Sequence, residues 1–182
     1  NETAGISVSG VSGGGASESG SQAVTITITD NESAPTVTLT TSATSIAENA
    51  GTSLTLTATL SVATTADVTV ALSTSGSATE GTDYTDGSGN VDDIVISAGS
   101  TTGTVSFTPT DDSIYDATSN ETAGISISAV SGGSATEDGN QAVTITITDN
   151  ESAPTLTLST SASSIVENAG SSLTLTATLS NG

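Results

Sequence analysis

Apolar residues alternate with Thr or Ser along most of the chain. Between residues 35 and 153 the alternation marks seven segments, which are 37–39, 54–60, 68–72, 94–96, 105–107, 125–127 and 143–147. A period of two places aliphatic side chains on one face of a β-strand and hydroxyl side chains on the other, as in antiparallel sheets with one face in water. Segments rich in Gly, Ser and Asp separate the runs, and no window has the periodicity of an amphipathic helix. The pattern predicts an all-β fold, with seven strands forming a two-sheet sandwich.

A long internal repeat divides the chain. NETAGISVSGVSGG from Asn1 recurs as NETAGISISAVSGG from Asn120, QAVTITITDNESAPT recurs unchanged from Gln141, and SIAENAGTSLTLTATLS recurs as SIVENAGSSLTLTATLS from Ser164. Each second copy begins 119 residues after the first, and 50 of the 61 positions in residues 1–61 are identical in residues 120–180. A β-solenoid would repeat every roughly 20–30 residues, so the long period favours tandem sandwiches. We expect the chain to be a window of a longer array, beginning and ending within a repeat.

The boundaries between repeats are predicted at the DNESAPT segments, residues 30–36 and 149–155. A proline at the start of a strand removes a backbone donor that needs no partner, which suits Pro35 and Pro154 to joints between domains. We therefore interpret residues 1–34 as the end of one repeat, 35–153 as a complete repeat, and 154–182 as the start of the next. A length of 119 residues is ordinary for one β-domain.

The charge composition excludes several classes of function. The chain has 20 Asp and Glu residues, a formal charge of −20, and no Lys, Arg, His, Cys, Met or Trp. Nucleic-acid binding is not expected, because it depends on Lys and Arg at the phosphates. No run approaches the roughly 18 apolar residues of a membrane span, so membrane insertion is not expected. The sequence offers no pair of residues suited to act as catalytic nucleophile and general base, so we do not expect the protein to be an enzyme.

The acidic residues gather between the predicted strands. Glu48, the pair Asp111 and Asp112, and Asp149 with Glu151 all lie in such segments. Adjacent carboxylates at about 5 Å repel by about 3 kcal/mol at an effective dielectric near 20. No Lys or Arg can relieve this repulsion, and clustered oxygens suit a hard cation, above all Ca²⁺. The alternative is an acidic, salt-tolerant surface that keeps a secreted chain soluble. The spacing does not match an EF-hand.

Four blocks carry a family resemblance: SIAENAGTSLTLTATLS (45–61), GSATEGTDYT (76–85), VISAGSTTGTVSFTPTDDSIYD (95–116) and AVTITITDNE (142–151). In this order they resemble a Calx-beta domain, a seven-stranded immunoglobulin-like sandwich first described in sodium–calcium exchangers. Such domains are common as tandem repeats in large bacterial surface proteins. The resemblance covers residues 36–151 and implies a Ca²⁺ site at one end of the sandwich.

The resemblance also implies a set of ligands. They are Glu48, Asp83, Asp111, Asp112, the carbonyl of Ile114, Asp116, Glu121, Asp149, Asn150 and Glu151. Asp116 stands where the family usually has Glu, Asn150 replaces an acid, and the DATSNET segment from Asp116 is longer and less charged than its family counterpart. These departures favour one primary ion over a cluster of several.

We therefore expect a structural protein of the extracellular space or cell surface, in which calcium stiffens an array of repeats in an adhesin, matrix protein or filament. Its expected partners are neighbouring repeats and further copies in a homopolymer or filament. The alternative is a surface-binding module that uses Thr-rich sheet faces to recognise ice, glycan or mineral. A calcium sensor is a weaker alternative, because sensors are one or two tuned domains and not near-identical copies.

Overall fold

The computed structural model describes residues 1–182 except 1, 87–90, 92, 117–119, 169 and 181–182. Strands, turns and bends make up the described residues, which include no helix. Chain contacts divide the molecule into two units, Asn1–Ala34 and Pro35–Gly182. The described part of the chain therefore contains no helix of the length and hydrophobicity that a membrane crossing requires.

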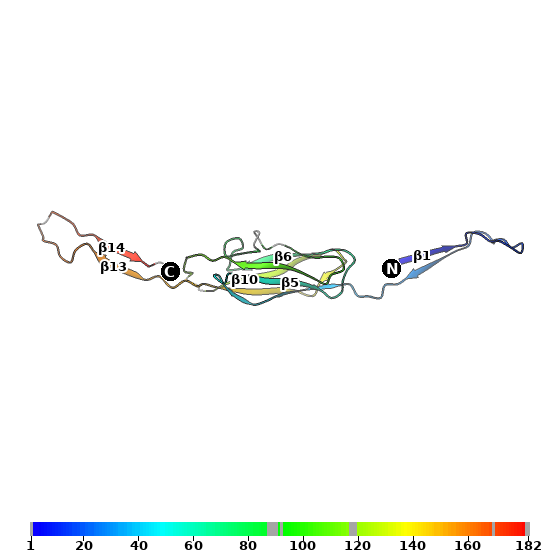
Figure 1. Cartoon of the computed structure of the whole chain (residues 1–182), viewed down its shortest axis with the longest axis horizontal. Helices are drawn as coiled ribbons and strands as arrows, with labels where there is room; N and C mark the ends of the chain where they lie inside the picture. Colours follow the sequence, from blue (N-terminus) through cyan, green and yellow to red (C-terminus); the bar gives the residue numbers. More distant parts are fainter. Residues whose placement is uncertain (1, 87–90, 92, 117–119, 169, 181–182) are drawn as a thin grey trace. The chain divides into compact units, whose positions relative to one another are not determined.

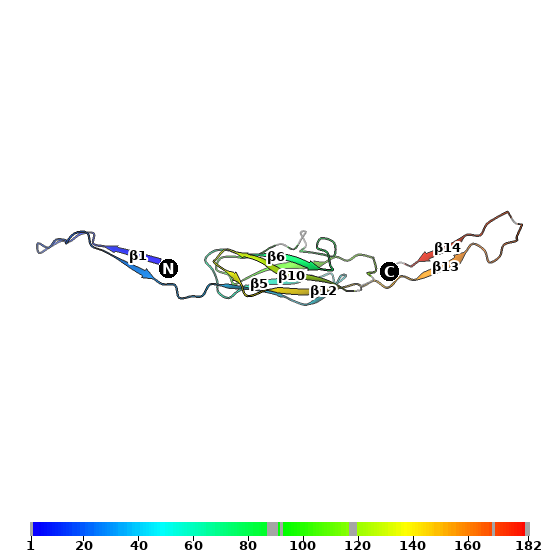
Figure 2. The ribbon, with the colours of Figure 1, turned by 180° about the vertical axis from the view of Figure 1, so that it is seen from behind.

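The second unit contains a sandwich of two five-stranded sheets (Figures 1 and 2). One sheet has the order β4-β12-β10-β6-β8 and the other has the order β11-β3-β5-β9-β7. The strands are β3 (Thr36–Thr41), β4 (Ser45–Ala47), β5 (Leu54–Leu60), β6 (Val68–Gly76), β7 (Tyr84–Thr85), β8 (Ile94–Ile96), β9 (Thr102–Pro109), β10 (Asn120–Ser131), β11 (Thr136–Glu137) and β12 (Ala142–Thr148).

The seven segments predicted from the alternation all fall in strands. The structure adds three short strands, β4, β7 and β11, each of two or three residues. None of these three strands contains two large apolar residues two positions apart, as β8 does, so the sequence pattern does not reveal them. The prediction of an all-β sandwich is confirmed, and the count of strands was too low.

Two of the short strands pair in parallel at a sheet edge. β4 pairs with β12 and β11 pairs with β3, whereas the other pairings in the sandwich are antiparallel. β4 follows β3 in sequence but lies in the opposite sheet, so the chain crosses from one layer to the other between Thr41 and Ser45. This crossing positions the residue that follows β4, Glu48, beside the end of β12.

The aliphatic faces of both sheets meet in one core. Val37, Leu56, Val70 and Ile145 are each fully buried in it. The rings of Tyr84 and Phe107 stack inside this core with centroids 4.6 Å apart, so the aromatic residues serve packing. Each buried aliphatic side chain contributes about 1.5–3 kcal/mol relative to exposure, and these side chains hold the two layers together.

A two-stranded hairpin lies at each end of the chain. β1 (Glu2–Ser7) pairs with β2 (Ala23–Ile28), and β13 (Leu156–Thr160) pairs with β14 (Leu175–Leu179), both antiparallel. All the residues of β2, β13 and β14 are exposed. Within the part of the chain that the structure describes, neither hairpin has a second layer.

Candidate metal centre

The parallel pairing of β4 with β12 brings two acidic loops together. Ala47 is opposite Thr148 in this pair, so the next residue of each strand, Glu48 and Asp149, leaves the sheet at the same end. The N–H of Glu48 donates to the carbonyl of Thr148 at 3.1 Å and fixes this arrangement. Glu48 and Asp149, which are 101 positions apart in the sequence, thus become neighbours through backbone pairing alone.

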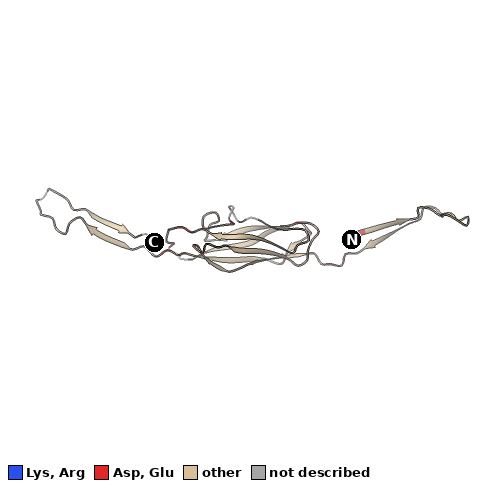
Figure 3. Ribbon diagram, viewed as in Figure 1, with Lys and Arg blue, Asp and Glu red and all other residues tan. Residues whose placement is uncertain are grey.

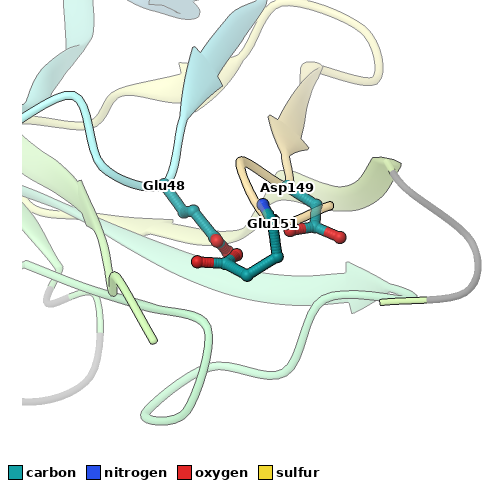
Figure 4. Close-up of side chains that lie close together, drawn as sticks. All are labelled: Glu48, Asp149 and Glu151. Carbon is teal, nitrogen blue, oxygen red and sulfur yellow. Dashed lines mark hydrogen bonds between the residues drawn. The ribbon is translucent and has the colours of Figure 1, made fainter. Parts of the chain in front are cut away.

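Three carboxylates form the centre of the site. One oxygen from each of Glu48, Asp149 and Glu151 lies within 4.8 Å of the others, and Figure 4 shows the carboxylates of Glu48 and Glu151 side by side. Asp149 accepts hydrogen bonds from the N–H of Glu151 at 2.8 Å and from the N–H of Asp116 at 2.9 Å. Asp149 therefore connects the end of β12 to the loop between β9 and β10.

Further acidic residues line a small cavity at this end of the sandwich. Its lining consists of Glu48, Asp83, Thr110, Asp112, Asp116, Asn120, Glu121, Ile147 and Asp149. Asp83 precedes β7, Asp112 follows β9, and Glu121 is the second residue of β10. Strands of both sheets begin or end at this end of the sandwich. Acidic residues from four separate segments of the sequence therefore lie around one cavity.

The charges at the site shift its ionisation equilibria. The possibility of sharing a proton with Glu48 first, and with Asp149 second, raises the pKa of Glu151 from 4.5 to about 7. Burial and the nearby Asp83 raise the pKa of Glu121. Hydrogen bonding from the backbone of Glu151 lowers the pKa of Asp149. The site thus holds a carboxyl group that stays partly protonated at neutral pH while its neighbour remains ionised.

Three of the expected ligands belong neither to the triad nor to the lining of the acidic cavity. Asp111 lines a neighbouring pocket with Glu48 and does not line the acidic cavity. Ile114 is 68% exposed, and its N–H donates to Asp112 at 2.6 Å. The amide of Asn150 donates to Glu151 at 2.9 Å, and the backbone N–H of Asn150 faces Glu48 at 3.5 Å.

Two cavity residues, Thr110 and Asn120, were not expected from the sequence. Both offer side-chain oxygen atoms, and both stand directly beside expected ligands, Thr110 before Asp111 and Asn120 before Glu121. Neither is an acid, so a search for clustered carboxylates could not find them. Their position directly beside acidic residues at a strand end is the only sequence feature that could have indicated them.

The donor set fits a hard divalent cation. Oxygen Oε2 of Glu151 is buried and has no hydrogen-bond partner, and the sequence contains no side-chain cation to approach it. Figure 3 shows that the sandwich strands are almost free of acidic residues, so the charge concentrates in the loops. Carboxylate oxygens in irregular loops are the ligands that Ca²⁺ prefers.

Comparison with known proteins identifies the family of the sandwich. The profile of the Calx-beta domain matches residues 30–151. The chain belongs to the Calx-beta domain family. Calx-beta domains bind Ca²⁺, and the chain therefore contains a calcium-binding β-sandwich module. The site residues named above lie within the matched range.

One solved structure similar to the chain is described as the crystal structure of CBD12 from CALX1.2. It shares 18% sequence identity with this Calx-beta chain at a TM-score of 0.49, and the match covers 62% of this chain and 44% of that one. The chain therefore spans less than half of the length of that structure. No curated protein sequence matches the chain.

Proposed function

We propose that this Calx-beta chain is a structural segment whose repeats are stiffened by calcium, a spacer, stalk or filament-forming part of a secreted or cell-surface adhesin or matrix protein. One observation carries the proposal: the acidic triad includes the first residues of the linker. Glu151 stands three residues before Pro154 and four before Thr155. A cation that binds Glu151 holds the linker against the sandwich.

The residues that would hold calcium come from the sandwich and from the first residues of the linker. Glu48, Asp149 and Glu151 are nearest to one another, and Asp83, Asp112, Asp116 and Glu121 surround the adjoining cavity. Ca²⁺ takes six to eight oxygen ligands and tolerates irregular geometry. Asp111 and the carbonyl of Ile114 would join only if their loop moved toward the cavity.

The near identity of the repeats supports a mechanical role. A spacer requires length and stiffness and gains nothing from sequence diversity, and the two copies differ mainly by exchanges such as Val8 for Ile127 and Thr52 for Ser171. Calx-beta domains are non-catalytic, which favours a role without enzymatic activity. Location outside the cell is part of this proposal, because millimolar calcium is available to weak sites of extracellular modules.

The test compares the flexibility and stability of the chain with calcium and with chelator at equal ionic strength. We expect calcium to raise the melting temperature of the sandwich and to reduce proteolysis at residues 151–155. Glu151→Gln should weaken both effects. Asp138→Asn is the matched control, since it removes one charge from the segment between β11 and β12, at the other end of the sandwich. Equal linker cleavage with calcium and chelator would contradict the proposal.

A second candidate function rests on the outer face of the β3-β5-β9 layer. This face carries only hydroxyl side chains in a chain of charge −20, namely Thr38, Thr40, Thr55, Thr57, Thr59, Thr102, Thr104 and Ser106. Such a regular array could recognise ice, glycan or mineral surfaces. Thr is also a favourable strand residue, so binding must be measured directly. Loss of binding to such a surface in Thr57→Lys, with an unchanged melting temperature, would support this candidate.

A further inference from the structure

The chain has to hold its clustered carboxylates without any side-chain cation. It contains no Lys, Arg, His or Trp, so its side-chain N–H donors are confined to the amides of Asn and Gln. These amides and the backbone N–H groups are the nitrogen donors that can orient an acid. Hydrogen bonds to an ionised carboxylate are stronger than those between neutral groups. The placement of such donors at the acidic end of the sandwich therefore decides which carboxylate oxygens stay free.

Backbone N–H groups hold the first member of the triad, Asp149. Its Oδ1 accepts from the N–H of Glu151 at 2.8 Å, and its Oδ2 accepts from the N–H of Asp116 at 2.9 Å. Both oxygens of this carboxylate are thus engaged by the backbone. The orientation of Asp149 does not depend on any other side chain.

Asn150 reaches the other two carboxylates, which lie side by side in Figure 4. Its side-chain Nδ2 donates to Oε1 of Glu151 at 2.9 Å, and its backbone N–H faces Oε1 of Glu48 at 3.5 Å. The second oxygen of Glu151, Oε2, is buried and has no hydrogen-bond partner among the described residues. Asn150 therefore occupies one oxygen of Glu151 and leaves the other one free.

The orientation of the Asn150 amide follows from its neighbour. An ionised carboxylate only accepts hydrogen bonds, so an amide oxygen turned toward Glu151 would meet a second acceptor. The same contact recurs in the first unit, where the amide nitrogen of Asn31, oriented to donate, lies 2.9 Å from Oε1 of Glu32. The adjacent Asn and Glu of this motif thus form the contact locally.

We propose that Asn150 is a positioning residue of the ion site and not a ligand: its amide holds the side chain of Glu151 so that Oε2 stays free for the cation. This role differs from the one that the family resemblance implied, in which Asn150 belongs to the ligands. The inference rests on the function proposed above, because it assumes that the triad binds calcium.

The benefit of the amide lies in ordering Glu151 before the ion binds. Fixing one long, flexible side chain during binding weakens affinity by about two- to tenfold. A glutamate that an amide already holds avoids this cost. An Asp at position 150 would instead place a further carboxylate beside Oε1 of Glu151, where two ionised groups repel each other.

The two possible roles of Asn150 predict opposite orders of calcium affinity. A ligand at this position would make Asn150→Asp bind calcium more tightly than Asn150→Ala, because a carboxylate is a strong ligand for a hard cation. For a positioning residue, we expect Asn150→Ala to bind about two- to tenfold more weakly than the unmodified chain. Asn150→Asp should bind more weakly still. Calorimetric titration of the full chain with CaCl₂ at constant ionic strength measures the affinities.

Asn140→Asp is the matched control. It makes the same isosteric exchange and adds the same charge in the segment between β11 and β12, at the opposite end of β12. It should leave the calcium affinity unchanged. Thermal unfolding in chelator adds a measurement that requires no ion. Asn150→Asp should melt at a lower temperature than Asn140→Asp, because only its new carboxylate lies beside Glu151.

The outcomes separate this inference from the function proposed above. Calcium binding by the unmodified chain, with Asn150→Asp tighter than Asn150→Ala or with Asn150→Ala unchanged, would overturn the positioning role and leave the proposed function in place. Equal melting temperatures of Asn150→Asp and Asn140→Asp in chelator would contradict the contact with Glu151. Absence of calcium binding by the unmodified chain would overturn the proposed function and, with it, the role of Asn150 in an ion site.

Discussion

At the residue scale, Glu151 determines how the site responds to pH. Its pKa rises to about 7 because Glu48 and Asp149 lie beside it, so the folded protein binds a proton more tightly than the unfolded chain does. That proton stabilises the fold fully below about 4.5, and the stabilisation is lost as the pH rises toward 7. The lowered pKa of Asp149 acts in a separate, more acidic range.

We therefore predict that the melting temperature of the metal-free protein falls between pH 4.5 and pH 7. Glu151→Gln cannot ionise, so it should flatten this dependence and stabilise the metal-free protein at neutral pH. Glu121, whose pKa is also raised, should leave a residual slope. Thermal unfolding in chelator across this range is the measurement. A variant with the same slope as the unmodified protein would show that Glu151 is not the titrating group.

The arrangement of the candidate site was only partly foreseeable at this scale. Acids at strand ends could be recognised from their clustering, and the family resemblance named Glu48 and Asp149. The sequence could not show that Glu151 lies against Glu48 while Asp111 faces a separate pocket. The position of Glu151 against Glu48 depends on the parallel pairing of β4 with β12, and β4 has only one large apolar residue, Ile46, so its sequence shows no alternation.

At the scale of strands, equivalent positions of the repeat lie in two different environments. Leu56 is fully buried in β5, and Leu175, which occupies the equivalent position in β14, is 69% exposed. We predict that Leu56→Ala lowers the free energy of unfolding of the sandwich by about 2–5 kcal/mol, because it removes packed methyl groups and leaves a cavity. Leu175→Ala should change it by less than about 0.5 kcal/mol. Chemical denaturation of both variants measures the difference.

The end of β6 depends on a glycine. Gly76 has a φ of +115°, and a Cβ atom there would lie 2.0 Å from the carbonyl oxygen of Thr122 in β10. Gly99 has a φ of +81° with nothing within 4 Å of the added atom. We predict that Gly76→Ala destabilises the sandwich more than Gly99→Ala, which bears only the backbone cost of about 1–3 kcal/mol. Similar losses in both variants would mean that β10 moves away freely.

The strand scale also shows where sequence patterns succeed. Strict alternation predicted every long strand, because a half-buried strand needs one apolar face. β7 and β11 were not predicted, since their pairing follows from contacts with β9 and β3 and not from their own composition. The aromatic pair of Tyr84 and Phe107 lies in the core, in agreement with the ordinary packing role of such residues.

At the scale of the whole molecule, an excess of negative charge opposes folding unless a cation offsets it. Folding brings Glu48, Asp83, Asp112, Asp116 and Glu121 around one cavity, and each close pair costs about 1–3 kcal/mol. A domain has about 5–15 kcal/mol of net stability. Repulsion at this one end is therefore comparable with the total stability, so a cation bound there would stabilise the fold.

We predict that chelation lowers the melting temperature of the sandwich steeply and that NaCl restores only part of the loss. Calcium bound only by the folded state adds about 4 kcal/mol at a thousandfold excess over its Kd, whereas NaCl only screens the charges. Asp112→Ala should reduce the response to calcium and slightly stabilise the metal-free protein, because it removes a repelling carboxylate. Asp138→Asn, at the opposite end of the sandwich, should leave the calcium response unchanged. Identical melting curves in calcium and in chelator at matched ionic strength would show that the acids only form a charged surface.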